Sequence, residues 1–322
     1  MNKFVLFIIS LFFFVGCSST PEETENNKHT QNVKIAYLPI IPDLPLFVAQ
    51  EKGFYGENNL KAEMIKVSGS GNQVIEALAR NDADFAYLAF STILEAEQRA
   101  SNSFLVFHHN IDNANTPPLY GLIVSEGTGI SSIGQLKGKT IGTFPGSAML
   151  NLTKLMLLAE GIDPENDVNL VQLPPSAQLS ALKTNQVDAL LSLEPTPTIA
   201  EVKKVGKVLD RTPLTPRVLE SIPTGGSVVL KGKYAENPVF YNSIISAIDK
   251  AIDYIREHPE EMYQFYMKYC NVEENVAREL PVLSYWKSNE IQKDVVQTYI
   301  NFLTEHKVLK KPIPLEQIYA NQ

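Results

Sequence analysis

Several residue types that mark particular classes of protein are scarce in this sequence. Its 322 residues include two cysteines, five histidines and one tryptophan, too few for a disulfide framework or a cysteine-rich metal site. Basic residues do not predominate, because 28 Lys and Arg stand against 36 Asp and Glu, a net charge of −8. We expect no nucleic-acid partner, since such proteins need a basic surface. The Gly-x-Ser-x-Gly motif of many hydrolases is also absent, so a serine nucleophile is not indicated.

The N-terminus has the pattern of an export signal. A short basic start precedes the apolar residues 4–15, which are too few to span a bilayer as a mature helix, and Gly16-Cys17 follows. This segment resembles a bacterial lipoprotein signal, and we predict a signal peptide at residues 1–16, a lipidated Cys17 and a flexible tether at residues 17–32. A plain secretory signal or a membrane anchor is the alternative. With Cys17 acylated, Cys270 lacks a disulfide partner, and we expect it to be a packed core thiol.

Two stretches of the chain share one pattern, a turn followed by a helix, a tight corner and a buried strand. The first occupies residues 67–91, and the second lies 104 positions later. The matching pairs are Ala77 with Ala181, Leu78 with Leu182, Asn81 with Asn185, and Asp84 with Asp188. We interpret them as two α/β lobes of similar design. Ligands of open α/β sheets bind beyond the carboxyl ends of the strands, where helix N-termini point, so the two lobes predict a cleft.

The predicted elements alternate between strand and helix up to about residue 230. We expect strands at residues 33–38, 60–67, 85–88, 104–107, 120–124, 140–143, 168–173, 189–193 and 228–230. From residue 237 the pattern is almost entirely helical, with helices at residues 238–257, 259–270 and 290–306. The predicted organisation is a first lobe at residues 33–122, a second lobe at 123–227, and a mostly helical return to the first lobe at 228–322.

Several motifs, in order, carry a resemblance to a known family. They are Leu46-Phe47-Val48-Ala49, Lys52-Gly53-Phe54-Tyr55, Asp82-Ala83-Asp84-Phe85, the segment 136–142, Gln186-Val187-Asp188-Ala189 and Glu194-Pro195. The chain resembles bacterial ABC-transporter solute-binding proteins of the nitrate, sulfonate, taurine and thiamine-precursor group. The resemblance covers residues 33–309 and implies the type II periplasmic-binding-protein fold, with a hinge and a ligand cleft between two lobes. One departure is Leu88-Ala89-Phe90-Ser91, where members often carry a Gly-x-x-Pro-like turn.

The resemblance also implies a function. We expect an extracytoplasmic solute-binding protein, held by its lipid to a bacterial membrane, that captures a small organic molecule by hinge closure. It would be a monomer without a cofactor or catalytic residues, and its partners would be an ABC permease and the ATPase of that permease. The alternatives are a ligand-binding sensor lipoprotein and an enzyme of the pyrimidine-precursor type on the same fold. Such enzymes work in the cytosol, which the export signal opposes, and the fungal type has a cysteine-rich motif that is absent here.

The candidate ligand-binding residues lie in loops at predicted strand ends. They are Tyr37, Asp43, Ser70, Asn72, Phe90, Ser91, Tyr120, Phe144, Ser147, Ser176 and Glu194. For each there is a structural alternative: a polar residue can cap its own helix, an aromatic ring can belong to the core, and Glu194 can brace the hinge.

The same loops suggest a ligand class. They contain no Lys or Arg but two carboxylates, Asp43 and Glu194, which favours a neutral or amine-bearing heterocycle over nitrate or an alkyl sulfonate. No metal site is predicted, because the adjacent His108 and His109 would point to opposite faces of a strand.

Overall fold

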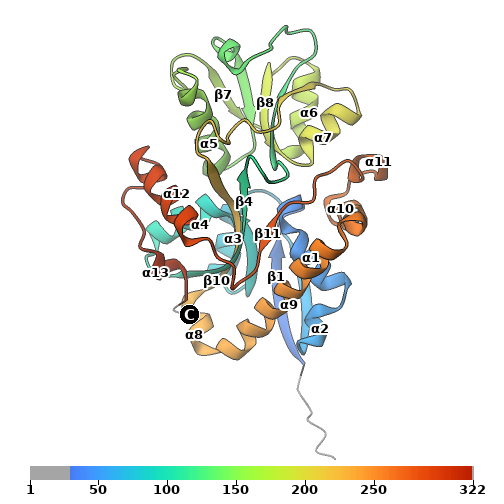
Figure 1. Ribbon diagram of the computed structural model, residues 1–322, viewed down its shortest axis with the longest axis vertical. Helices are drawn as coiled ribbons and strands as arrows, with labels where there is room; N and C mark the ends of the chain where they lie inside the picture. Colours follow the sequence, from blue (N-terminus) through green and yellow to red (C-terminus); the bar gives the residue numbers. More distant parts are fainter. Residues whose placement is uncertain (1–29, 321–322) are drawn as a thin grey trace, which may run out of the picture.

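The computed structural model describes residues 30–320. The predicted signal peptide, Cys17 and all but the last three residues of the predicted tether lie outside the described residues. Within residues 30–320, each helix is too short or too polar to cross a membrane. Figure 1 shows two lobes: the smaller one is green and yellow, and the larger one combines blue and orange segments from both ends of the chain.

A six-stranded sheet forms the centre of the larger lobe. Its strand order is β11 (Tyr285–Trp286), β4 (Phe104–Asn113), β10 (Ser221–Leu230), β3 (Phe85–Ala89), β1 (Gln31–Tyr37) and β2 (Leu60–Lys66). Strand β1 pairs in parallel with β2 and β3, whereas β10 is antiparallel to both β3 and β4. Almost every residue of β3, β4 and β10 is buried, as expected for strands covered on both faces.

A five-stranded sheet forms the centre of the smaller lobe. Its strand order is β7 (Asn169–Gln172), β6 (Thr140–Thr143), β8 (Ala189–Leu193), β5 (Tyr120–Val124) and β9 (Lys207–Asp210). Its helices are α5 (Ser147–Ala159), α6 (Pro175–Lys183) and α7 (Thr196–Val202). Residues 114–119 and 211–220 connect the two sheets, so the boundaries predicted at 122/123 and 227/228 fall inside β5 and β10.

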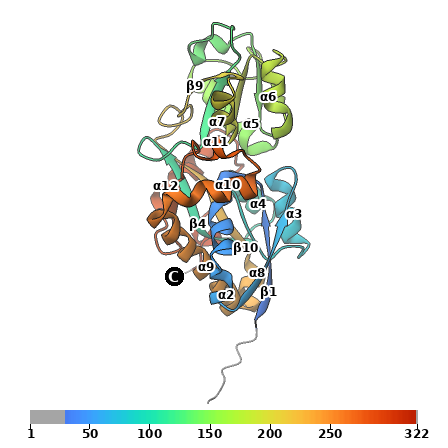
Figure 2. The same ribbon diagram turned by 90° about the vertical axis from the view of Figure 1, so that its right-hand side faces the viewer.

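The helices of the larger lobe come from both ends of the described chain. They are α1 (Leu44–Glu51), α2 (Phe54–Glu57), α3 (Gly71–Ala79), α4 (Phe90–Arg99), α8 (Lys231–Glu236), α9 (Pro238–Glu257), α10 (Met262–Cys270), α11 (Glu274–Ala277), α12 (Lys293–Glu305) and α13 (Leu315–Ile318). Helix α9 packs on α1 and α2, which joins the helical return to the start of the fold. Figure 2 shows α10 and α11 at the level where the lobes meet, and α11 contacts α7.

The predicted repeat has a physical basis in the two corners. Asn81 and Asn185 both adopt a left-handed conformation, with φ of 59° and 57°, which asparagine tolerates better than most residues. The Asp84 carboxylate accepts a hydrogen bond from the backbone N–H of Lys34 in β1 at 2.8 Å. In the second lobe, Asp188 accepts one from Thr140 in β6 at 2.9 Å. Each corner carboxylate therefore fastens the strand beside the one that follows it, β1 next to β3 and β6 next to β8.

Some predicted bounds were wrong, and the reason is tertiary pairing. Strand β4 continues to Asn113 instead of ending at residue 107, because its polar second half pairs with β10 and β11. Strand β10 begins at Ser221 rather than at 228, and β9 and β11 were not predicted. Strands β5, β6 and β8 and helix α9 have the predicted bounds.

Candidate functional site

Residues of both lobes line one cavity between the two sheets. Its empty volume, which includes space open to solvent, is about 780 Å³. Seven of the predicted site residues line it: Asp43, Ser70, Asn72, Ser91, Tyr120, Phe144 and Ser147. We call this space the central cavity.

The other four predicted residues lie elsewhere. Ser176 and Glu194 line a neighbouring cavity that shares Phe144 with the central cavity. Tyr37 lines neither, and its ring packs edge-on against Phe47 at 5.3 Å between centroids. Phe90 also lines neither and is fully buried, next to the β10 backbone at Gly226. The structure thus places these two aromatic rings in the core.

Three helices start at the central cavity. Helix α3 begins after Ser70, whose N–H donates to Gln73 Oε1 at 3.2 Å. Helix α4 follows β3 without a loop, and α5 begins after Gly146, which adopts φ of 112°. The first turn of a helix presents N–H groups that have no partner within the helix. The central cavity therefore offers backbone donors as well as the hydroxyl groups of Ser91 and Ser147.

Asp43 is the carboxylate of the central cavity. It ends a short 3-10 turn, Ile41–Asp43, and its side chain is fully buried. Oδ2 accepts a hydrogen bond from the Leu38 N–H at 2.8 Å, while Oδ1 is buried and has no partner among the described residues. Burial raises the pKa of Asp43 well above its usual value, and the Leu38 hydrogen bond opposes that rise only in part. One oxygen of the carboxyl group thus holds the loop, and no described residue satisfies the other.

The comparisons with known proteins agree with this architecture. A family model described as "NMT1/THI5 like" matches residues 43–262, more than half of the chain. The chain belongs to the NMT1/THI5-like family. A Bacillus subtilis (strain 168) protein named as a putative aliphatic sulfonates-binding protein is 25% identical over 330 residues, covering 100% of this chain and 95% of that one. The bicarbonate-binding protein CmpA of a Synechococcus species is 24% identical over 203 residues, covering 55% of this chain and 44% of CmpA.

A solved structure shows the same fold. The periplasmic aliphatic sulphonate binding protein SsuA from Escherichia coli has a TM-score of 0.72 at 16% identity, covering 90% of this chain and 97% of SsuA. The family and this likeness confirm the predicted resemblance and the type II periplasmic-binding-protein fold. They also confirm the predicted general class, a solute-binding protein.

Glu194 is fully buried, and protein groups already occupy its carboxylate. Oε1 accepts hydrogen bonds from Thr198 Oγ1 at 3.0 Å and from the Arg211 guanidinium at 2.8 Å, and Oε2 accepts one from the Thr198 N–H at 3.2 Å. Burial raises the pKa of Glu194, and Arg211 and Thr198 counteract that rise. The arrangement ties the start of α7 to the connecting segment 211–220. This matches the hinge-bracing alternative, and Arg211 was not among the predicted site residues.

A Ser-His-Asp arrangement exists in the larger lobe, away from both cavities. The ring of His108 lies 2.7 Å from Ser227 Oγ through Nδ1 and 3.1 Å from Asp249 Oδ1 through Nε2. His108 and Ser227 are fully buried and line neither cavity, so a substrate has no access to them. His109 takes the opposite face and stands beside Trp286, at 5.9 Å between ring centroids. The group holds β4, β10 and α9 together rather than forming a catalytic triad.

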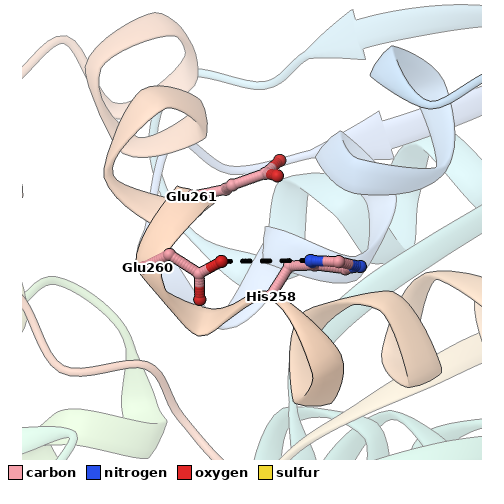
Figure 3. A group of neighbouring side chains, drawn as sticks. All are labelled: His258, Glu260 and Glu261. Atoms are coloured by element: carbon pink, nitrogen blue, oxygen red, sulfur yellow. Dashed lines mark ion pairs between the residues drawn. The ribbon is translucent and has the colours of Figure 1, made fainter.

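Among residues 30–320, one group of side chains brings three metal-type ligand atoms within 4.8 Å of one another: His258, Glu260 and Glu261. Figure 3 shows His258 and Glu260 facing each other, with 3.9 Å between Nδ1 and Oε1. Glu261 Oε2 already accepts hydrogen bonds from Lys52 at 2.8 Å and from Tyr254 at 2.6 Å. Because a lysine already neutralises one of the two carboxylates, we do not interpret this surface group as a metal site.

Proposed function

We propose that this protein captures a small organic molecule in the central cavity, outside the cytoplasm, and delivers it to the permease of an ABC importer. The observation that carries the proposal is that both lobes line the cavity. Asp43, Ser70 and Ser91 come from the larger lobe, and Phe144 and Ser147 come from the smaller one. A ligand that contacts both walls stabilises the closed arrangement of the lobes, which is how binding drives closure.

Two connecting segments provide the hinge in this proposal. Residues 114–119 lead from β4 to β5, and residues 211–220 lead from β9 back to β10. Asp112, at the end of β4, accepts a hydrogen bond from Thr215 at 3.2 Å and another from the Leu119 backbone, and together they tie the two segments to each other. The lobes also touch through Lys203 and Glu273, 2.7 Å apart. Both partners are largely exposed, so this ion pair contributes little and separates easily.

The proposal includes binding without chemical conversion. The described residues that line the central cavity include no His, Cys, Lys or Arg, and their only carboxylate is Asp43. A general acid–base or nucleophilic mechanism needs a nucleophile and a base within hydrogen-bond reach of each other. This part of the chain offers no such pair at the lining, which supports a binding protein over an enzyme.

The lipid anchor is a further part of the proposal. Cys17 would be the mature, acylated N-terminus, and the protein would work as a monomer beside its permease and ATPase. The support is the apolar run followed by Gly16-Cys17. A single acyl chain holds a protein only weakly, so we expect more than one chain on Cys17.

Small-angle scattering tests lobe closure. Ligand retained through gentle purification would be identified by mass spectrometry, removed, and added back to the protein. We expect a smaller radius of gyration on addition. Ser147→Trp should abolish this change by filling the cavity, whereas Leu158→Trp on the same helix should not, because Leu158 is 51% exposed. A ligand that binds tightly without compaction would contradict the closure mechanism.

A further inference from the structure

We infer that the central cavity selects a ligand with an N–H donor, as in an amine or an amino-substituted ring, and places that donor on Oδ1 of Asp43. The inference rests on the proposed function and adds the chemical class of the ligand. The inferred ligand class differs from the anions, sulfonate and bicarbonate, that appear in the names of two relatives.

The first argument is the charge of the lining. Within residues 30–320, no Lys, Arg or His lines the central cavity, and the only carboxylate there is Asp43. A small anion would rely on the N-termini of α3, α4 and α5, with no side-chain cation from these residues to pair with it. It would also meet the Asp43 carboxyl group. A ligand with a donor or a positive charge finds a complementary group at the same place.

The second argument is the hydrogen bonding of Asp43. Leu38 satisfies Oδ2, and Oδ1 has no partner within the described part of the chain although it is buried. Two nearby hydroxyl groups do not supply one. Tyr87 Oη donates to Asn110 at 3.1 Å, and Tyr285 Oη donates to the carbonyl of Ile41 at 2.9 Å. Buried acceptors are rarely left without a donor in native proteins, so the missing donor points to the ligand.

The remaining lining describes the rest of the molecule. Apolar and aromatic side chains form most of it, including Leu88, Leu119, Phe144, Met149, Leu152 and Tyr299. Such walls favour a ligand with an apolar or flat body. The donor group would therefore sit on one edge of that body.

Asp43→Asn is the decisive variant. The Leu38 N–H needs an acceptor, so the amide oxygen of the substituted side chain should take the place of Oδ2 and leave its NH₂ group where Oδ1 was. A ligand donor would then face a donor and lose its bond. If Asp43 instead acted as a neutral acid that donates to a ligand acceptor, the amide would preserve binding. The two readings predict opposite results from one substitution.

Calorimetry at pH 6 with defined probes tests this. The donor probes are benzylamine and 4-aminopyrimidine, and the anions are benzoate, benzenesulfonate, nitrate and bicarbonate. We expect the wild-type protein to bind a donor probe at least tenfold more tightly than any anion, and Asp43→Asn to weaken that binding at least tenfold. Asp82→Asn is the matched control, because that carboxylate is exposed and pairs with Arg80 outside the cavity. It should change nothing.

Several results would overturn the inference: tighter binding of an anion, no bound donor probe, or an unaffected Asp43→Asn variant. If an anion binds and compacts the protein, the ligand class is wrong while the proposed function stands. If no bound ligand causes compaction, the proposed function itself fails.

Discussion

Asp112 offers a direct test of how burial at the hinge affects stability. It is 3% exposed and bonded to Thr215. Burial raises the pKa of its carboxyl group from 3.8 to about 6, although hydrogen bonds from Thr215 and the Leu119 backbone oppose the rise. The folded state therefore binds this proton more tightly than the unfolded state. The resulting stabilisation is present below about pH 4 and is lost as the pH rises through about 6.

The magnitude follows from the difference between the two pKa values. A difference of about 2 corresponds to about 3 kcal/mol, at about 1.4 kcal/mol per pKa unit. The Asp112→Asn variant keeps an oxygen acceptor for Thr215 and cannot ionise. Relative to that variant, the wild-type protein should lose up to about 3 kcal/mol of unfolding free energy between pH 4 and pH 7.

Urea unfolding of both proteins at pH 4, 5, 6 and 7 measures this difference. The exposed Asp82→Asn variant is the control and should follow the wild-type protein at every pH. Parallel curves for wild type and Asp112→Asn, or a wild-type protein that gains stability relative to the variant as pH rises, would refute the reasoning. The first result would mean that the carboxyl group is not desolvated in solution.

Three further predictions concern single residues. Arg211→Met should cost about 2–3 kcal/mol of unfolding free energy at pH 7, because it leaves the buried Glu194 carboxylate without its cation. The cost should be smaller than for a fully buried ion pair, since Arg211 is 34% exposed. Urea unfolding should show that adding Glu194→Gln restores part of the loss. Gly225→Ala should destabilise the protein by about 1–3 kcal/mol in the same assay, because a Cβ there would lie 2.7 Å from Asn110 Oδ1. Gly232→Ala is the control and should leave stability unchanged, since no described atom lies within 4 Å of its Cβ. Cys17→Ser should move the protein from the membrane to the soluble fraction or leave it uncleaved, and unchanged fractionation and processing would rule out the lipid anchor.

The local parts of the fold were predictable because their signals are contained in short segments. The corner at Asn81 combines a left-handed residue with a carboxylate that caps the neighbouring strand, and the same chemistry recurs at Asn185. The second half of β4 carries no such signal. The predicted strand ended at residue 107, but His108, His109 and Asn110 are also buried in β4, because β10 and β11 lie on either side of it. Pairing between segments more than 100 residues apart decides that outcome.

The hydrogen-bond partners of the site residues also depend on contacts that the sequence alone does not show. Asp43 and Glu194 looked equivalent as carboxylates in loops expected to face the cleft. In the folded protein, Arg211 and Thr198 donate hydrogen bonds to both carboxylate oxygens of Glu194. Asp43, by contrast, accepts a hydrogen bond only from the Leu38 N–H among the described residues. The pairing with Arg211 could not be seen in the sequence, because Arg211 lies 17 residues from Glu194 and in another structural element. We therefore propose that Glu194 braces the hinge rather than binding the ligand. In the same proposal, the charge preference of the cavity depends on Asp43, whose Oδ1 has no partner among the described residues.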